Sequence, residues 1–296
     1  MGISVIGSAN ADLTVQVERR PDAGETLLGS DLLTSAGGKG ANHAAAAALL
    51  GAEVRFYGCV GADANGAVVR ASLLAAGVHL EALEVTAAAT GCALILATPD
   101  GENSIVVAPG ANRLVNAEYL ARHPQWLAAD VVVMQHEVPL ETISRVAATC
   151  RERRLRFILN AAPAAPIAPE VLAVCDPLVV NAHEAAVVAG LGADELPARR
   201  LAELLVDLGA RSVVVTLGAA GSIGLDTTGG FIQQDAEPVA AVDTTGAGDA
   251  FVGALASALD AGRSLAEAMA LGTRVSAVVV QRAGAQTSYP RLDELR

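Results

Sequence analysis

The sequence predicts an α/β fold in which helices flank a doubly wound, mostly parallel sheet. Short β-branched runs alternate with Ala- and Leu-rich stretches over most of the 296 residues. Several of these runs contain a continuous apolar stretch, such as Val131–Met134, as expected for strands that are buried on both faces of a parallel sheet. We therefore predict one α/β domain spanning residues 1–296, although two smaller domains would also fit a chain of this length.

The elements of the main sheet follow from these runs in chain order. The predicted strands are Ile3–Gly7, Val54–Val60, Val131–Gln135, Arg156–Asn160, Leu178–Asn181 and Ser212–Leu217. The predicted helices are Ala41–Leu50, Gly66–Ala76, Leu140–Arg151, Leu196–Leu208 and Asp249–Asp260. Gly51, Gly77 and Gly209 come just after three of these helices, at the position where a glycine commonly ends a helix.

Two segments interrupt this alternation. Residues Leu13–Ala36 and Thr90–Val107 carry Thr and Val and contain the turn signals Pro21-Asp22-Ala23-Gly24 and Pro99-Asp100-Gly101. A helix fits comfortably in neither segment. We predict that these insertions, at about 13–36 and 90–107, form extra antiparallel strands of a small β subdomain that projects from the main sheet.

The composition excludes several functional classes. The net charge of −12 would repel a phosphate backbone, and four Phe, three Tyr and one Trp are too few for a base-stacking platform. We therefore expect no nucleic-acid partner. No run of 18 apolar residues occurs and the N-terminus is typical of a strand rather than a signal peptide, so we expect no membrane partner and a cytoplasmic location.

The four cysteines do not form a recognisable site. Cys59, Cys92, Cys150 and Cys175 are too far apart in the sequence for a zinc or redox motif. We expect free and mostly buried thiols in a reducing compartment.

The strongest local motif is Val242-Asp243-Thr244-Thr245-Gly246-Ala247-Gly248-Asp249, which leads directly into a predicted helix. Its glycines allow close approach of a ligand to the backbone, and the positive end of the helix favours a phosphate there. An aspartate in this setting stays ionised and can accept a hydroxyl proton from a substrate. The alternative is that Asp249 only caps the helix.

A second glycine cluster is Ala36-Gly37-Gly38-Lys39-Gly40-Ala41-Asn42, which also enters a helix and contains the only lysine of the chain. It is not a Walker A loop, because Gly40 follows the lysine where Ser or Thr is required. Its backbone donors, ammonium group and carboxamide suit a polyhydroxylated ligand. The alternative is a glycine-rich turn with a solvated lysine.

A third polar cluster follows the first predicted strand. Gly7-Ser8-Ala9-Asn10-Ala11-Asp12 lies where ligands bind in open α/β sheets, beyond the carboxyl end of a strand, although an Asx turn would look the same. His136-Glu137 follows another strand but lacks the second histidine of a zinc protease motif, and no Gly-x-Ser-x-Gly elbow occurs. His43 lies on a helix, where a histidine is more often packed or exposed than catalytic.

Taken together, these motifs resemble the ribokinase (PfkB) family of carbohydrate kinases. Asp243–Asp249 resembles the C-terminal signature of that family and Gly37–Asn42 its N-terminal signature. Five further motifs follow in the family order: Gly7-Ser8-x-Asn10-x-Asp12, Pro21-x-x-Gly24-Glu25-Thr26, Asn181-x-x-Glu184, Thr216-Leu217-Gly218-x-x-Gly221 and Gly284-Ala285-Gln286. The resemblance covers nearly the whole chain, and it implies a ribokinase-like sheet with a β-sheet lid formed by the two insertions.

The resemblance also implies a function. It implies an ATP-dependent sugar kinase that phosphorylates D-ribose at O5 to give D-ribose 5-phosphate, with Asp249 as the base that also contacts the sugar. Gly246, Ala247 and Gly248 would form an anion hole, with Gly248 also touching the nucleotide. The sugar would be held by Asn10, Asp12, Gly38, Lys39, Asn42 and Glu137.

Cofactor sites follow from the same resemblance. ATP would contact Asn181, Thr216, Gly218, Gly221 and Thr273, and Glu184 would place Mg²⁺ through water. An activating K⁺ ion would be bound by oxygens of Asp243, Thr245, Val279, Arg282, Gly284 and Ser288. The lids of two chains would pair to form a homodimer, which would also protect their strand edges.

Two departures from the family pattern concern the sugar. His43 stands where these enzymes usually carry Gln, and Gln135-His136-Glu137-Val138-Pro139 replaces the usual Gln-Leu-Glu-Ser-Pro. The alternatives are therefore a kinase for another pentose, a ketose or a nucleoside. From a different class, a non-catalytic sugar or nucleotide sensor would not require Asp249, and a nicotinamide-dependent oxidoreductase would require the missing Gly-x-Gly-x-x-Gly.

Overall fold

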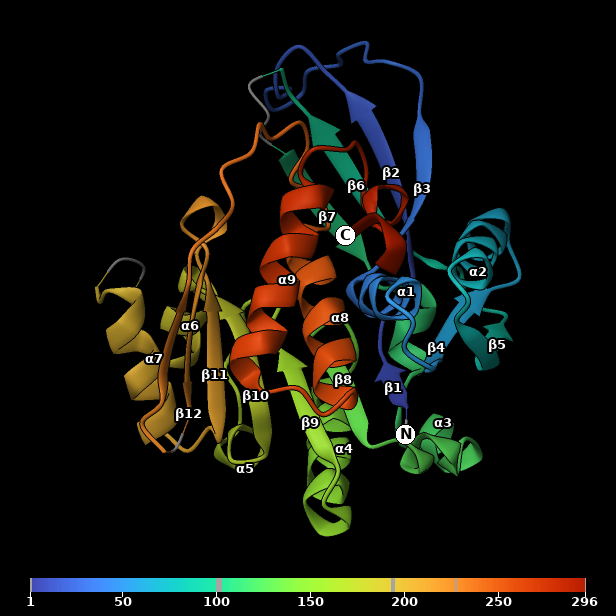
Figure 1. The fold of residues 1–296 in the computed structure, drawn as a ribbon. Helices are drawn as coiled ribbons and strands as arrows, with labels where there is room; N and C mark the ends of the chain where they lie inside the picture. Colours follow the sequence, from blue (N-terminus) through green and yellow to red (C-terminus); the bar gives the residue numbers. More distant parts are fainter. Residues whose placement is uncertain (1, 100–102, 193–194, 227, 296) are drawn as a thin grey trace.

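A computed structural model describes residues 2–99, 103–192, 195–226 and 228–295. Within this described part, nine strands form one sheet in the order β13-β12-β11-β10-β9-β8-β1-β4-β5 (Figure 1). Neighbouring strands from β11 to β5 are parallel, whereas β12 and β13 continue the sheet as antiparallel strands. The predicted mostly parallel, doubly wound sheet is confirmed.

The strands of this sheet have the following bounds: β1 Ile3–Ile6, β4 Val54–Gly61, β5 His79–Thr86, β8 Val131–Gln135, β9 Arg156–Asn160, β10 Cys175–Asn181, β11 Ser212–Thr216, β12 Ser222–Asp226 and β13 Phe231–Gln234. The helices are α1 Lys39–Leu49, α2 Ala64–Ala75, α3 Ala117–Arg122, α4 Leu140–Arg153, α5 Pro169–Leu172, α6 Ala182–Val188, α7 Ala198–Asp207, α8 Ala247–Asp260 and α9 Leu265–Val279. Short 3-10 turns connect several of them, among them η1 Gly110–Leu114, η3 Gly218–Ala220 and η4 Gln286–Ser288.

The sheet separates two hydrophobic cores. On one face, alternate strand residues such as Val5, Val133 and Ile158 pack against α1, α2, α8 and α9. On the other face, Ile6, Met134 and their neighbours pack against α3 to α7. Both faces of each central strand are therefore buried, which explains the nearly continuous apolar runs in the sequence. None of the described helices combines the length and apolar character that a membrane span needs.

A second sheet of four described strands projects from the carboxyl end of the main sheet and forms a lid (Figure 1). Its order is β3-β2-β6-β7, with bounds β2 Asn10–Gln16, β3 Leu33–Gly37, β6 Gly91–Ala97 and β7 Asn103–Ala108. The outer pairs are antiparallel, but β2 and β6 are parallel. The prediction of wholly antiparallel strands is wrong for this pair, because β2 and β6 both leave the main sheet in the same direction.

Several elements were not predicted from the sequence. Strand β5, strands β12 and β13, and helices α3, α5, α6 and α9 were all missed. Helices α1, α2 and α8 each begin two residues earlier than predicted, at Lys39, Ala64 and Ala247. In the predicted turn at Pro99-Asp100-Gly101, Asp100 and Gly101 lie outside the described residues.

Candidate active site

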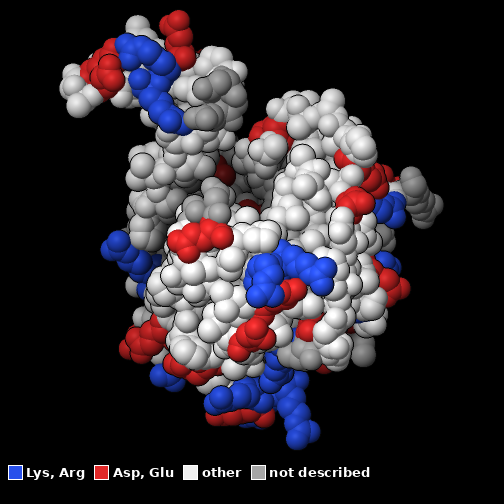
Figure 2. Space-filling view, turned by 90° about the vertical axis from the view of Figure 1, so that its left-hand side faces the viewer, with Lys and Arg blue, Asp and Glu red and all other residues white. Residues whose placement is uncertain are grey.

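The topology brings the predicted motifs to one end of the sheet. Strand β1 lies between β8 and β4, so the chain order reverses at the boundary between β1 and β8. Open α/β sheets bind ligands at such a switch point, beyond the carboxyl ends of the strands. Figure 2 shows a hollow between the projecting lid and the body of the molecule, with acidic side chains recessed inside it.

Glu137 accepts hydrogen bonds from the segments that flank this switch point. The hydroxyl of Ser8, after β1, donates to Oε2 of Glu137 at 2.6 Å, and the backbone N–H of Lys39, at the start of α1, donates at 3.1 Å. The Asn10 amide nitrogen lies 3.5 Å from the same oxygen. The carboxylate thus joins the β1 loop, helix α1 and the β8 loop at one point.

Asn112, on η1, fixes the side chain of Asn10 through a hydrogen bond. Its amide nitrogen donates to Oδ1 of Asn10 at 2.6 Å, and its Oδ1 accepts the backbone N–H of Ala9 at 2.9 Å. Asn112 is buried, so both bonds are made away from water. With its Oδ1 fixed in this way, Asn10 turns its amide nitrogen toward Glu137.

Gly38 is required by the backbone at the start of α1. It has φ of 88°, and a Cβ built on it would lie 2.6 Å from the backbone N of Asn10. Any other residue would be strained and would push the β1 loop away from helix α1. Gly38 therefore allows Lys39 and Asn10 to line the same site.

Asp12, on strand β2 of the lid, lies close enough to Glu137, Asp249 and Lys39 for their charges to affect its pKa. Burial, together with the negative charges of Glu137 and Asp249, raises the pKa of Asp12 to about 7, against the opposing charge of Lys39. This carboxyl group therefore changes charge near neutral pH, where an ordinary aspartate is fully ionised.

Asp249, in the first turn of α8, is surrounded by residues of α1. The Asn42 amide donates to Oδ2 of Asp249 at 2.8 Å, and Nζ of Lys39 lies 3.7 Å from Oδ1. Burial alone would raise the pKa of Asp249, but the charge of Lys39, the nearby His43 and the Asn42 bond outweigh it and hold the pKa well below its usual value. Asp249 is therefore a carboxylate at neutral pH.

The positive charge of Lys39 is stabilised in turn by Asp249. The negative charge of Asp249 raises the pKa of Lys39 despite burial, and Glu137 and Glu184 add to this effect. The ammonium group is thus held between the carboxylates of the site.

A chain of hydrogen bonds extends from Asp249 to helix α2. Gln286, on η4, donates from its amide nitrogen to Oδ1 of Asn42 at 2.9 Å. The hydroxyl of Ser72, on α2, donates to Oε1 of Gln286 at 2.6 Å. Each amide therefore uses its oxygen to accept one bond and its nitrogen to donate the next, which fixes the orientation of Asn42 toward Asp249.

The start of α8 offers backbone donors beside Asp249. Gly246 precedes the helix with φ of 75°, and a Cβ on it would lie 2.8 Å from the hydroxyl of Tyr289. No side chain caps the helix. The Ala247 N–H donates to the Thr244 carbonyl at 3.2 Å, so an anion at the start of α8 would be bound mainly by the neighbouring N–H groups. A Cβ built on Gly248 would meet no atom within 4 Å, which indicates open space in front of the helix.

The predicted nucleotide residues lie after β10 and β11. Asn181 and Glu184 form a capping box at the start of α6, in which each side chain accepts the other residue's backbone N–H at 2.8 Å. Burial raises the pKa of Glu184, against the effects of the Asn181 bond and Lys39. Glu184 is therefore close enough to Lys39 and Asp249 for their charges to affect its pKa. The Asn181–Glu184 pair also stabilises the start of α6 as a capping box.

The remaining nucleotide residues are less closely grouped. Thr216 ends β11 and its hydroxyl donates to the Val180 carbonyl at 3.3 Å, while Gly218 and Gly221 form the η3 turn that follows. Thr273 lies in α9, which packs on β12 and β13, and its buried hydroxyl makes no hydrogen bond with any described residue. The structure thus places Thr273 on a separate helix, which packs against β12 and β13.

Asp243 joins the two segments predicted to bind a monovalent cation. Its Oδ1 accepts the N–H of Thr245 at 2.9 Å and its Oδ2 accepts the N–H of Gly284 at 2.8 Å. Burial would raise the pKa of Asp243, but these bonds outweigh it and lower the pKa. The predicted oxygens of Val279, Arg282 and Ser288 lie in the same returning segment, where Arg282 donates to the carbonyls of Val279 and Ser288.

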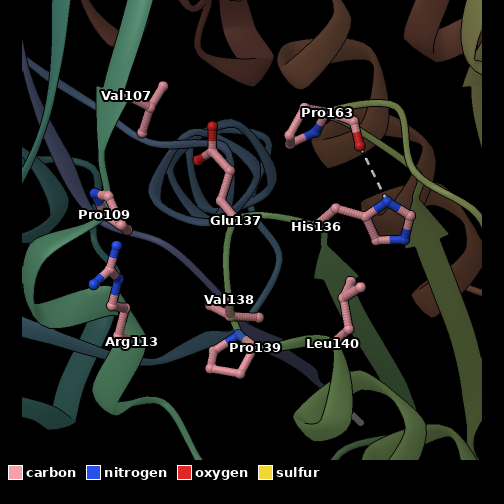
Figure 3. Close-up of a pocket in the computed structure, with 9 residues that line it drawn as sticks. All are labelled: Val107, Pro109, Arg113, His136, Glu137, Val138, Pro139, Leu140 and Pro163. Atoms are coloured by element: carbon pink, nitrogen blue, oxygen red, sulfur yellow. Dashed lines mark hydrogen bonds between the residues drawn. The ribbon is translucent and has the colours of Figure 1, made fainter.

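A cavity of about 380 Å³ adjoins Glu137 (Figure 3). Its walls come from the lid, η1, and the segments after β8 and β9, and the lining residues are Val107, Pro109, Arg113, His136, Glu137, Val138, Pro139, Leu140 and Pro163. The Glu137 side chain projects into it between Val107 and Pro163. Nδ1 of His136 donates to the Pro163 carbonyl at 3.1 Å, which fixes the ring at the edge of the cavity.

Sequence reasoning did not identify several residues that organise this site. Asn112 and Gln286 were not assigned roles, and Ser8 and Ser72 were not considered as partners of a site residue. Each acts through a contact distant in the sequence, and an isolated Asn, Gln or Ser has no local pattern that reveals such a contact. The available signals were the positions of Ser8 and Gln286 inside the motifs Gly7-Ser8-x-Asn10-x-Asp12 and Gly284-Ala285-Gln286.

Comparisons with known proteins agree with this geometry. Residues 2–292 match the model of the pfkB family of carbohydrate kinases. A ribokinase of Bacillus subtilis is 38% identical over 296 residues, covering 99% of this chain and 97% of the relative, and one of Schizosaccharomyces pombe is 34% identical over 309 residues, covering 100% and 96%. A solved structure of Arabidopsis thaliana ribokinase complexed with ribose and ATP superimposes with a TM-score of 0.89 at 33% identity, covering 99% of this chain and 97% of that one.

Proposed function

The chain belongs to the pfkB family of carbohydrate kinases, and on this premise we propose that it transfers the γ-phosphoryl group of ATP to O5 of D-ribose. The products are D-ribose 5-phosphate and ADP. Full-length similarity to several ribokinases supports the choice of ribose. The observation that carries the proposal is the convergence of Lys39, Asn42 and Asp249 beside the start of helix α8, which no side chain caps.

Asp249 acts as the base in this proposal. Its low pKa keeps it ionised, so it accepts the proton of the attacking hydroxyl as the bond from O5 to the γ-phosphorus forms. The bond from that phosphorus to the oxygen bridging the β- and γ-phosphates breaks, and ADP leaves with the electron pair. No covalent enzyme intermediate is needed, because the two substrates react directly in line.

The sugar is oriented by the polar residues at the switch point. Asn10, Asp12 and Glu137 supply amide donors and carboxylate acceptors, and Gly38, Lys39 and Asn42 close the site from helix α1. Holding several hydroxyl groups at once restricts the sugar to the reactive orientation, which is the main contribution a protein makes to phosphoryl transfer.

The backbone N–H groups of Gly246, Ala247 and Gly248 stabilise charge on the transferred phosphoryl group. They lie at the positive end of α8, and the open space in front of Gly248 leaves room for the phosphate oxygens. The rest of ATP is bound by Asn181, Thr216, Gly218 and Gly221 and, from α9, by Thr273.

Glu184 fits a water-mediated role toward Mg²⁺. Among the described residues no three His, Cys, Asp or Glu side chains are grouped to hold a metal, so one carboxylate with water and ATP phosphates is the donor set that remains. Mg²⁺ keeps several water ligands in such sites and neutralises charge on the β- and γ-phosphates.

The loop around Asp243 fits a monovalent cation. Its donors are the ionised Asp243 carboxylate, the Thr245 backbone and oxygens of Val279, Arg282, Gly284 and Ser288, a set of oxygen ligands of the kind K⁺ prefers. K⁺ bound there would add positive charge next to the start of α8.

The experiment that tests this function is an ADP-release assay with ribose, deoxyribose, fructose, other pentoses and nucleosides, each in the presence of ATP and Mg²⁺. We expect ribose to give the highest kcat/KM. Turnover of another sugar in preference to ribose would correct the substrate, and binding of sugar without ADP release would support a sensor instead.

One observation favours a second acceptor class. The cavity beside Glu137 has apolar walls from Val107, Val138 and Pro163 and room for a substituent larger than a hydroxyl group (Figure 3). The panel therefore includes nucleosides, whose bases need such a space. Nucleoside turnover that is lost on changing Pro163 to Trp, with ribose turnover retained, would support this acceptor class.

We propose that residues 1–296 form one domain whose lid, from about 13–36 and 90–107, pairs two chains into a homodimer in the cytoplasm. Leu94 and Val106 are paired neighbours on one face of the lid and are each exposed by half or more, and a second lid would cover them. Buried thiols with raised pKa, such as Cys59 and Cys150 at about 12, suit a reducing compartment. Light scattering should give twice the chain mass, and L94E should reduce it to one chain.

A further inference from the structure

His43 is a buried histidine without hydrogen bonds next to Asp249. It lies on α1, and its side chain has no exposed surface. Neither Nδ1 nor Nε2 makes a hydrogen bond with any described residue. Nε2 lies 3.5 Å from Oδ1 of Asp249, on the opposite oxygen from the one that Asn42 contacts.

The surroundings determine the charge of the ring. A positively charged imidazole would have an N–H at Nδ1 that is buried without an acceptor, which is costly. A neutral ring protonated at Nδ1 would instead direct the lone pair of Nε2 at a carboxylate. The neutral ring protonated at Nε2 avoids both penalties, because it turns a donor toward Oδ1 and leaves one neutral acceptor buried, rather than a charged donor.

We propose that His43 is a positioning residue for Asp249, in which a neutral imidazole presents its Nε2–H to Oδ1 of the carboxylate. The inference rests on the proposed function, since Asp249 matters here as the base. Asn42 donates to Oδ2 and His43 to Oδ1, so a donor on each oxygen fixes the plane of the carboxylate. The 3.5 Å separation is longer than a normal hydrogen bond, and such bonds commonly shorten when substrate is bound.

Other ionisable groups also face Asp249 and remain in every variant below. Lys39 lies on α1, Asp12 on the lid, Glu184 on α6, and Tyr289 follows η4, where burial and the charges of Asp249 and Asp12 raise its pKa. Lys39 is the strongest of these influences on Asp249. Removing His43 therefore leaves Asp249 ionised at neutral pH but less well oriented.

The test compares His43→Leu and His43→Gln with the wild-type enzyme. Leu has similar bulk and no donor, whereas Gln keeps an N–H donor at similar reach. We expect His43→Leu to lower kcat about tenfold with the ribose KM changed less than threefold, and to move the acid limb of the kcat profile to higher pH. His43→Gln should restore most of kcat and the wild-type limb.

Wild-type kcat and pH profile in a folded His43→Leu enzyme would overturn the inference, as would a His43→Gln enzyme no better than His43→Leu. Asp249→Asn is measured in parallel. If it keeps normal turnover, the proposed base is wrong. If it is inactive while His43→Leu is normal, only the role of His43 is wrong.

A second measurement does not depend on the folding of His43→Leu. Nitrogen-15 NMR of the imidazole in the full-length wild-type protein at pH 7.5 should show a neutral ring protonated at Nε2, and Asp249→Asn should shift the Nε2 signal. A doubly protonated ring, a ring protonated at Nδ1, or a signal unaffected by Asp249→Asn would overturn the inference.

Discussion

Asn42 and Asp249 are 207 positions apart in the chain, yet the Asn42 amide donates to Oδ2 of Asp249 at 2.8 Å. The contact is made because α1 and α8 pack side by side on the same face of the sheet, and each begins at the switch point. The N-terminal motif thus supplies the donors that orient the carboxylate of the C-terminal motif. The two signatures form one site and not two.

Replacing Asp249 by Asn removes the proposed base and keeps its size. We expect kcat to fall at least ~10²-fold while ribose affinity stays within a few-fold, because the loss affects proton transfer more than binding. ADP release and calorimetry measure the two quantities. The control is the same substitution at Asp260, at the other end of α8. Near-normal turnover in the Asp249→Asn enzyme would show that Asp249 is not the base.

Gln286→Leu should lower kcat about tenfold, because Asn42 loses the bond that fixes its amide. Ser72→Ala, one bond further from Asp249, should have a smaller effect. Steady-state kinetics of both variants, with thermal unfolding to confirm folding, test this gradient. Equal effects of the two changes would contradict the chain of bonds as we describe it.

Ribose binding should depend on pH through Asp12. Because its pKa is raised to about 7, mainly by burial, Asp12 gains its negative charge as the pH rises from 6 to 8. The anion accepts sugar hydroxyls better than the neutral acid, so the ribose KM should fall over this range. Asp12→Asn should have a higher KM that changes little with pH, and a wild-type KM that is flat from pH 6 to 8 would contradict the assignment.

The same pKa shift predicts an effect on stability. A carboxyl group whose pKa is higher in the folded state than its usual 3.8 stabilises the fold in acid and loses this contribution as the pH rises through about 7. Asp12→Asn should therefore raise Tm more at pH 8.5 than at pH 5. Calorimetric scans at the two pH values provide the comparison.

Lys39→Arg keeps the positive charge but should raise the ribose KM about tenfold. A planar guanidinium is bulkier than an ammonium group and does not fit in the same way between glycines and Asp249. Arg122→Lys exchanges the same two cations at a surface pair with Glu84 and should leave KM unchanged. A wild-type KM in Lys39→Arg would mean that the lone lysine has no special role.

Activity should be severalfold higher in K⁺ than in tetramethylammonium at equal ionic strength. Asp243 supplies the only carboxylate of the proposed site, so Asp243→Asn should remove most of this difference. Initial rates in the two salts, for both proteins, give the answer. Equal wild-type rates in the two salts would count against the cation site.

The sheet and the two glycine motifs were predictable because their signals are local. Buried parallel strands such as β8 contain a continuous apolar run, and Gly246 and Gly38 precede helices in short, dense motifs. Helix α9 was missed although Ser264 and Glu267 form a capping box, a signal present in the sequence. Strand β5 was missed because it lies at the edge of the sheet and its residues alternate between polar and apolar, unlike the apolar run of a central strand such as β8.

The supporting contacts of the site were not predictable in this way. Asn112 contacts Asn10 across 102 positions and Gln286 contacts Asn42 across 244. Such pairs depend on how the lid and the C-terminal segment pack onto the main sheet. The proposed role of His43 depends on its burial, which likewise results from the packing of α8 against α1.

Lys39 gives this enzyme an internal probe. Because the chain has no other lysine, methylation of amines with ¹³C-formaldehyde would label only Lys39 and the α-amino group of the chain. The single ε-amine resonance would then report directly on the ionisation of Asp249, 3.7 Å away, as sugar and nucleotide are added. Protection of this amine by ribose would measure occupancy of the site in a mixture, without an activity assay.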